Sequence, residues 1–468
     1  MSVDGFLFDA GRKMRHEEWK GSFEDYLNMA IKNPTITQLS TERIYNMILS
    51  HGTKEREDGS IEYGFFKNRI FGSTKQIDQL MMYLKAASMG LDIKKRVVLL
   101  LGPPGGGKSM ILGMIKKGLA SYSRTQEGAV YAIDSCPINE DPMHLIPEGR
   151  RGELRSRYGI RIEGKLCPWC QFRFENEWNL NLNNVPVRRI YLSEENRIGI
   201  GTFAPAERND MDELYGSADL SKLEQYGNAG DVRAYDFNGE LHTANRGLME
   251  FIEVLKAKPE FLHILLTLAE EQMFKTPRFP LQYVDELLIA HTNEGEFLRF
   301  IGNRENEAII DRFHIIKMPY NMREEDEEQI YHSALKSKLK VDNMKIHPGG
   351  LRLASEFVIR TRQHENELRV GMGGISPRFI LNTIALAFVS VNKPLITPKD
   401  FYTVLCQQIH HYPILTSEKR DEYMNYLRDI GTKIHEYEEI NVQPLSKSRN
   451  SNHTATRSSM FDDLILGD

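Results

Sequence analysis

A glycine-rich loop at residues 102–109 carries the strongest chemical signal in the sequence. It reads GPPGGGKS and fits G-x-x-x-x-G-K-[ST], a pattern whose backbone N–H groups surround the phosphates of a nucleoside triphosphate. Lys108 is placed to reach the β- and γ-phosphates, and Ser109 to hold Mg²⁺. We therefore predict a Mg-ATP site made by Gly102, Pro103, Pro104, Gly105, Gly106, Gly107, Lys108, Ser109 and Met110.

The elements around this loop have the order that the motif requires. RVVLLL (96–101) is a short apolar run, typical of a parallel strand that is buried on both faces, and MILGMIKKGLASY (110–122) has a helical pattern. LMEFIEV (248–254) and LLIAHTN (287–293) predict further strands separated by helices. This alternation predicts an α/β fold with a three-layer parallel sheet.

An ATPase also needs an acid that polarises the attacking water. The stretch ANRGLMEFIEVLK resembles a strand of the helix-2-insert branch of AAA+ proteins, which includes magnesium chelatases and MCM helicases. On this resemblance Glu253 is the catalytic glutamate, whereas Ile252 occupies the place of the Mg²⁺-associated Asp and argues for altered hydrolysis. Glu250 is an alternative acid, but it shares the strand face of Ile252, so a partnered carboxylate is the preferred interpretation.

The same resemblance implies three further functional residues. Asn293 fits the sensor-1 position that orients the lytic water, and a helix cap is the simpler alternative. Arg312 corresponds to an arginine finger for a neighbouring subunit's ATP, with a surface salt bridge as the alternative and Arg304 as a competitor. Arg378, in GISPRFI, corresponds to sensor 2 of a helical lid. An inter-subunit arginine implies a homo-oligomer, either a ring or a filament.

The pattern along the chain predicts four regions. They are an N-terminal helical segment (1–65), an AAA+ α/β nucleotide-binding core with insertions (66–320), a helical lid with C-terminal helices (321–442) and a polar, disordered tail (443–468). The chain has 468 residues and a net charge of -5, which makes nucleic acid an improbable partner. No apolar run approaches the roughly 18 residues that cross a membrane, so we expect a cytoplasmic protein.

A narrower resemblance extends from about residue 17 to about residue 440. EEWKGSFEDYL, SEENRIGIGTF, FNGELHTANRGLMEF and DELLIAHTNEGEF look like the PrkA family, whose members are described as serine protein kinases with an AAA+ part. The resemblance implies Mg-ATP-dependent phosphorylation of serine or threonine in a protein substrate. PrkA-like chains usually continue well past the equivalent of Asp468, and no H-R-D, D-F-G or V-A-I-K kinase motif is present. An ATPase that remodels or helps degrade proteins, or a nucleotide-switched scaffold, is the alternative.

Four residues predict a second cofactor, Zn²⁺. Cys167 and Cys170 form a C-x-x-C knuckle, and Cys136 and His144 lie upstream, which makes a tetrahedral set of three sulfurs and one nitrogen. The alternative is a core Cys136, a solvated His144 and a structural or redox-active C-x-x-C pair.

Overall fold

The computed structural model describes residues 19–440, apart from residues 206–210, 228–230, 277–278, 280, 339–344 and 392. The tail predicted at 443–468 lies outside the described residues. Among the described helices, none has both the length and the apolar character needed to cross a membrane.

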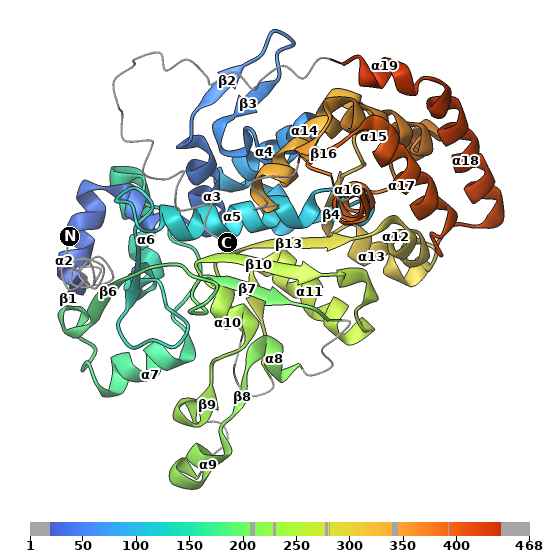
Figure 1. Cartoon of the computed structure of the whole chain (residues 1–468). Coiled ribbons are helices and arrows are strands. Elements are labelled where there is room, and N and C mark those ends of the chain that lie inside the picture. The colour runs from blue at the N-terminus through green and yellow to red at the C-terminus, as the bar shows by residue number, and fades with distance from the viewer. Residues whose placement is uncertain are drawn as a thin grey trace, which may run out of the picture.

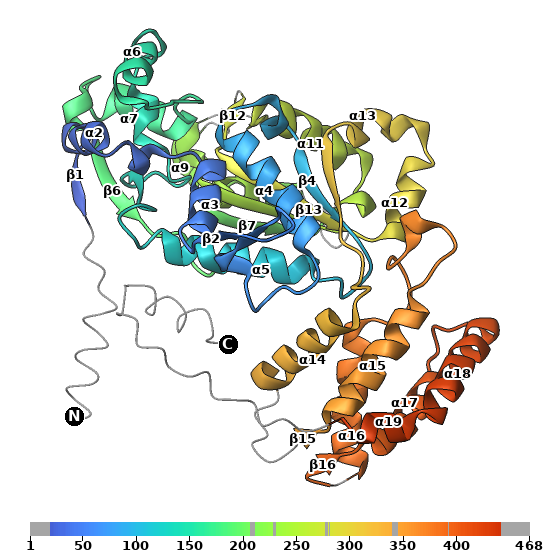
Figure 2. The ribbon, with the colours of Figure 1, turned by 90° about the horizontal axis from the view of Figure 1, so that it is seen from above.

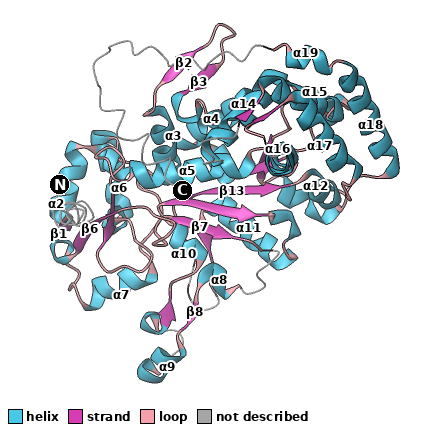
Figure 3. Cartoon of the chain, viewed as in Figure 1, coloured by secondary structure: helices cyan, strands magenta, loops and turns pink. Residues whose placement is uncertain are grey.

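A parallel sheet of five strands forms the centre of the chain (Figure 3). Its strand order is β14-β4-β13-β10-β7. The strands are β4 (Val97–Leu101), β7 (Ile200–Phe203), β10 (Gly247–Ile252), β13 (Glu286–Thr292) and β14 (Phe313–Lys317). All five residues of β4 are buried, because helices cover both faces of the sheet.

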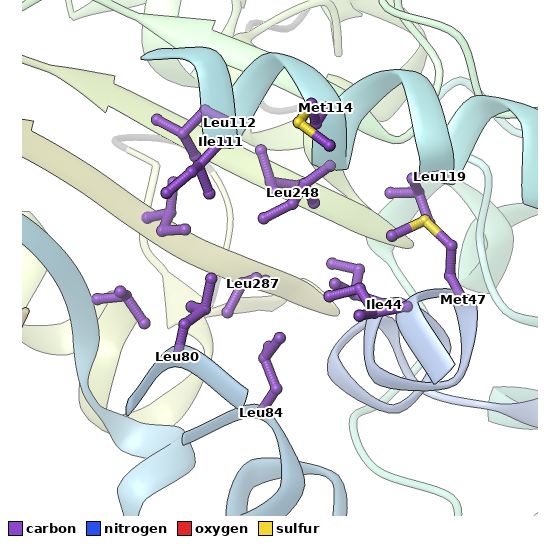
Figure 4. Packing of buried hydrophobic residues seen from close by; sticks show 14 of the residues in the cluster. Ile44, Met47, Leu80, Leu84, Ile111, Leu112, Met114, Leu119, Leu248 and Leu287 are labelled. Atoms are coloured by element: carbon purple, nitrogen blue, oxygen red, sulfur yellow. The ribbon is translucent and has the colours of Figure 1, made fainter. Parts of the chain in front are cut away.

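Alternation along the strands divides the core into two layers. Val98 and Leu100 pack with α3 (Ser40–Leu49), α4 (Thr74–Ser88) and α5 (Lys108–Tyr122), and Figure 4 shows leucine, isoleucine and methionine side chains of this layer interlocking. The opposite face carries Val97 and Leu99. Its helices are α10 (Glu240–Ala244), α11 (Pro259–Glu271), α12 (Glu294–Ile301) and α13 (Glu307–Ile310).

A second lobe lies beside the central sheet, at the left of Figure 1. It is built on the antiparallel sheet β1-β6-β5, with β1 (Lys20–Ser22), β5 (Val130–Ile133) and β6 (Pro186–Ile190). Its helices are α2 (Phe23–Lys32), α6 (Glu148–Tyr158) and α7 (Pro168–Asn176). The sequence pattern predicts that residues 1–65 are helical. The structure differs, because this segment also contains strand β1 and a hairpin of β2 (Thr53–Glu55) and β3 (Ile61–Tyr63).

The C-terminal helices form a bundle apart from the sheet, as the view from above shows (Figure 2). They are α14 (Glu324–Lys338), α15 (Pro348–Thr361), α16 (Pro377–Val391), α17 (Pro398–His410), α18 (Ser417–Thr432) and α19 (Ile434–Glu438), with a short ladder of β15 (Lys345–Ile346) and β16 (Leu395–Ile396). At its base the buried Arg362 pairs with Glu327 at 2.7 Å. We call this bundle the lid.

A small projection hangs below the sheet in Figure 1. It comprises α8 (Asp212–Tyr215), β8 (Ser217–Ala218), α9 (Leu220–Tyr226) and β9 (Tyr235–Asp236). The short pair β11 (Met273–Phe274) and β12 (Gln282–Tyr283) follows α11.

Candidate nucleotide site

The glycine-rich loop connects the carboxyl end of β4 to the first turn of α5. Gly102 has no room for a side chain, because a Cβ there would lie 2.1 Å from the Met318 carbonyl oxygen. Gly105 and Gly107 have φ angles of 80° and 85°, in the left-handed region that glycine enters without strain. The loop therefore has the tight turn that directs N–H groups and a helix N-terminus towards an anion.

Lys108 lies folded into the loop that it is predicted to serve. Its ammonium group donates to the carbonyl oxygens of Gly102 at 2.7 Å and Pro103 at 2.8 Å. Burial lowers the pKa of Lys108 to about 8, and the negative charge of Glu253 opposes that shift. A phosphate group offers this ammonium a stronger partner than two neutral carbonyl oxygens do.

A cavity of about 300 Å³ opens beside the loop, between the sheet and the lid. Residues 105–110 line one side, and Arg378 at the start of α16 lines another. The cavity is thus bordered by both the predicted phosphate loop and the predicted sensor-2 arginine.

Sequence reasoning missed the rest of the cavity wall, which comes from residues without a motif. It includes Arg69, Ile70, Phe71, Ser73, Tyr320, Asn321 and α14 residues Ile330, Ser333 and Ala334. The one sequence signal for this wall is a glycine, Gly72. The structure requires glycine there, because its φ is 71° and a Cβ would lie 2.2 Å from Asn321 Oδ1. The Tyr320 hydroxyl donates to the Pro104 carbonyl oxygen at 2.5 Å and so fastens the loop to the start of the lid.

Glu253 and Asn293 lie at the same sheet edge as the loop. Each follows directly on its strand, β10 or β13, and these strands run parallel to β4, with Thr292 level with Leu101. Glu253 has an unusual φ of 49° and pairs with Lys256. Asn293 caps α12 by accepting from the Glu296 N–H at 2.9 Å. A left-handed glutamate is a strained conformation of the kind that occurs at functional sites.

The Glu250 carboxylate is paired with two other side chains. Its carboxylate lies 2.5 Å from the Lys116 ammonium and 3.2 Å from His291 Nε2, beneath α5. Burial alone would raise the pKa of Glu250, but His291 and Lys116 outweigh that effect and hold it below its usual value. The preferred sequence interpretation, a partnered carboxylate, agrees with these contacts.

Arg312 lies far from its own chain's loop. Its carbonyl oxygen accepts from Val97 N–H, at the opposite end of β4 from Gly102, and five strand residues span roughly 16 Å. The guanidinium contacts Asp311 at 3.0 Å and Glu270 at 3.3 Å. The competing Arg304 is exposed in the turn that follows α12.

The structure brings together three of the four predicted zinc ligands. The sulfurs of Cys136, Cys167 and Cys170 lie within 4.8 Å of one another. His144 is outside this group, since its Nδ1 contacts Glu140 and its Nε2 lies 2.5 Å from the Glu163 carbonyl oxygen. His144 is also buried, so both sequence interpretations of it, as a zinc ligand and as a solvated loop residue, disagree with the geometry.

Comparisons with known proteins cover most of the chain. The family profile for the PrkA AAA domain matches residues 21–369, and that for the PrkA serine protein kinase C-terminal domain matches residues 336–454. The chain is 38% identical to the "ATP-dependent protease PrkA" of Bacillus subtilis, over 97% of this chain and 77% of that protein. It is 28% identical to the "Serine/threonine kinase YeaG" of Escherichia coli, over 93% of this chain and 72% of that protein.

Two solved structures show weaker likenesses. NtrX from Brucella abortus in complex with ADP has a TM-score of 0.37 at 14% identity, over 80% of this chain and 64% of that chain. A RuvB mutant from Thermotoga maritima has a TM-score of 0.37 at 12% identity, over 72% of this chain and 71% of that chain.

Proposed function

The chain belongs to the PrkA family and has an AAA+ P-loop fold, and from this premise we propose that it is an ATPase that acts on protein substrates. The observation that carries the proposal is Lys108, buried in a glycine loop at the edge of a cavity that Arg378 also borders. ATP would place its phosphates against the loop N–H groups and the Lys108 ammonium. The adenosine would occupy the space towards Ile70, Tyr320 and α14.

Mg²⁺ fits the residues at this edge. Ser109 is exposed in the first turn of α5 and borders the cavity, and its hydroxyl is an oxygen ligand of the kind that Mg²⁺ prefers. When bound, the ion would neutralise charge on the β- and γ-phosphates. Ile252 contributes no ligand, so we expect slower turnover than with an Asp at that position.

The chemical step requires a positioned nucleophile. Glu253 would accept a proton from the attacking water, and the Asn293 side-chain amide would orient that water while its oxygen continues to cap α12. To act, Glu253 must release Lys256, its present partner. Arg378 would contact the γ-phosphate from the lid side, which couples phosphate loss to lid position.

Arg312 would act on the nucleotide of a neighbouring copy, because it cannot reach its own. A mixing experiment tests this proposal. Lys108→Ala chains lose the phosphate contact but keep Arg312, and Arg312→Ala chains do the reverse. Mixing two such inactive variants should restore ATPase activity at the mixed interfaces. Assembled mixtures without recovered activity would contradict the inter-subunit role, and Arg304→Ala tested in the same way is the matched alternative.

The names of two relatives suggest two uses for the energy of ATP. Remodelling a protein, or delivering it for degradation, is favoured by the more similar relative, which is named an ATP-dependent protease. Phosphorylation of serine or threonine is the second candidate, favoured by the relative that is named a kinase. In that case Glu253 would accept the proton of a substrate hydroxyl instead of a water proton.

One experiment separates these uses. Phosphate release and transfer of γ-phosphate label to protein are measured in the same tube, with Lys108→Ala as the blank. Phosphate release without labelled protein supports the remodelling ATPase. Labelled serine or threonine that disappears in Lys108→Ala and in Glu253→Gln supports the kinase. Bound ATP with neither signal would defeat both and favour a nucleotide-switched scaffold.

A further inference from the structure

Three cysteines meet in the second lobe although they are distant in the sequence. Cys136 follows β5, whereas Cys167 and Cys170 belong to the start of α7. Their exposed fractions are 3%, 4% and 0%, and all three are free thiols. Each contributes a sulfur to one group whose atoms are mutually within 4.8 Å.

The spacing of the sulfurs suits a shared ion better than a disulfide. The Cys136 and Cys167 sulfurs are 3.8 Å apart, whereas a disulfide bond is about 2.05 Å long. In a tetrahedral site with Zn–S bonds of about 2.3 Å, neighbouring sulfurs lie about 3.8 Å apart. The cluster therefore has the dimension of one edge of a zinc tetrahedron.

Backbone amide groups approach two of the three sulfurs, those of Cys167 and Cys136. Cys167 is the N-cap of α7, Pro168 follows it, and the Cys170 N–H donates to the Cys167 sulfur at 3.3 Å. Cys136 also precedes a proline, and the backbone groups of Ile138 and Glu140 hydrogen-bond to its sulfur. Amide donors and a helix N-terminus stabilise the negative charge that zinc-bound sulfur carries.

A buried carboxylate links the two cysteine segments. Glu140 accepts from the Cys167 N–H at 2.7 Å, and its other oxygen contacts His144. Because His144 also contacts the Glu163 carbonyl oxygen, it holds Glu140 in place. Glu140 and His144 thus position the loop that carries Cys167 and are not themselves within the ligand group.

A fourth ligand is needed for a closed zinc site. His242, on α10, is 1% exposed, and its Nδ1 has no hydrogen-bond partner among the described residues. Its Nε2 lies 3.3 Å from Gln282 Oε1, and its ring centroid lies 5.3 Å from that of Phe237, which belongs to the same buried cluster as the three cysteines. The ring nitrogens fall outside the 4.8 Å group, so His242 must move towards the sulfurs to bind.

We propose that Cys136, Cys167 and Cys170 bind one structural Zn²⁺ ion and that His242 Nδ1 completes its tetrahedral coordination. The ion joins the loop after β5 to α7 and to α10. The same loop reaches the start of β10, because the Asn245 side chain donates to the Ile138 carbonyl oxygen at 2.8 Å and Arg246 pairs with Asp141. Zinc would thereby brace β10, the strand that ends directly before Glu253.

Metal content of the purified full chain tests the three sulfurs. Protein made in zinc-supplemented medium and purified without chelator should carry one Zn²⁺ per chain by mass spectrometry. Cys406→Ser should keep that ion, because Cys406 lies in α17, outside the cluster. Cys167→Ser should lose it. Wild-type protein without zinc, or a Cys167→Ser variant with the same zinc content as Cys406→Ser, would overturn the site.

Cobalt keeps the test decisive if Cys167→Ser does not fold. Wild-type and Cys406→Ser chains made with Co²⁺ should show sulfur-to-cobalt charge-transfer bands and the intense visible bands of tetrahedral Co²⁺. Their absence in folded wild-type protein would also overturn the site. His242→Gln should retain the charge-transfer bands but shift the visible bands and release metal to a chelator faster. A spectrum identical to wild type would remove His242 from the ligand set.

Discussion

We predict that Lys108 makes nucleotide affinity dependent on pH, in a range where lysine normally does not titrate. Phosphate binds the protonated ammonium, and the Lys108 pKa in the free chain is about 8, lowered by burial. As pH rises through 8 the free chain loses this proton, whereas the nucleotide complex retains it, so the affinity must fall. About 90% of Lys108 is charged at pH 7 and about 10% at pH 9, which corresponds to a tenfold loss of affinity, or about 1.4 kcal/mol.

Titration calorimetry with Mg-ATP measures both consequences. Repeating it in buffers of different ionisation enthalpy should show uptake of about 0.1 proton per nucleotide at pH 7, 0.5 at pH 8 and 0.9 at pH 9. Lys108→Gln should bind more weakly, with no such pH dependence. Flat wild-type affinity to pH 9 without proton uptake would refute the argument, because it would mean that the loop does not desolvate the ammonium.

Three further predictions concern packing around the site. Gly102→Ala places a Cβ 2.1 Å from a backbone oxygen, so it should lower the free energy of unfolding by about 1–3 kcal/mol in thermal unfolding and abolish ATP binding. Gly113→Ala meets nothing within 4 Å and should be neutral or stabilising. Equal effects of the two changes would contradict the close packing of Gly102. Lys116→Met leaves the Glu250 carboxylate without its ammonium partner and should lower the free energy of unfolding by about 3 kcal/mol in denaturant titrations. Adding Glu250→Leu should recover most of that loss. A double variant less stable than Lys116→Met would contradict the idea that the loss comes from an unpaired buried carboxylate. Tyr320→Phe removes one hydrogen bond to the loop and should weaken ATP affinity roughly fivefold in equilibrium binding, and unchanged affinity would show that the bond does not hold the loop.

The phosphate loop and the strands near it were predictable because their signals are local. A run of apolar residues before GPPGGGKS defines β4, and parallel pairing then brings the ends of β10 and β13 to the same edge. Both the α/β fold class and the PrkA family resemblance are confirmed. The roles of Glu253, Asn293, Arg312 and Arg378 stay predictions.

Other features depend on contacts between distant residues, which a single sequence does not reveal. Strand β1 has three residues and exists because it pairs with β6, more than 160 positions away. The wall formed by Ile70 and Asn321 comes from turns that carry no motif. His144 has the sequence spacing of a zinc ligand, but in the fold its buried ring contacts the Glu140 carboxylate.

Tyr320 gives the lid a mechanical connection to the phosphate loop. It stands where the chain leaves the sheet for the lid, with its hydroxyl on Pro104 and its ring 4.6 Å from the guanidinium carbon of Arg362. Arg362 is itself held at the lid base, where it pairs with Glu327 and donates to the Asn321 carbonyl oxygen, so Tyr320 connects these contacts to the phosphate loop. A lid rotation that stretched the Tyr320–Pro104 hydrogen bond would be coupled to nucleotide binding, and the coupling free energy would be the same in both directions. Force applied to the lid by a bound protein should therefore change how tightly ATP is held.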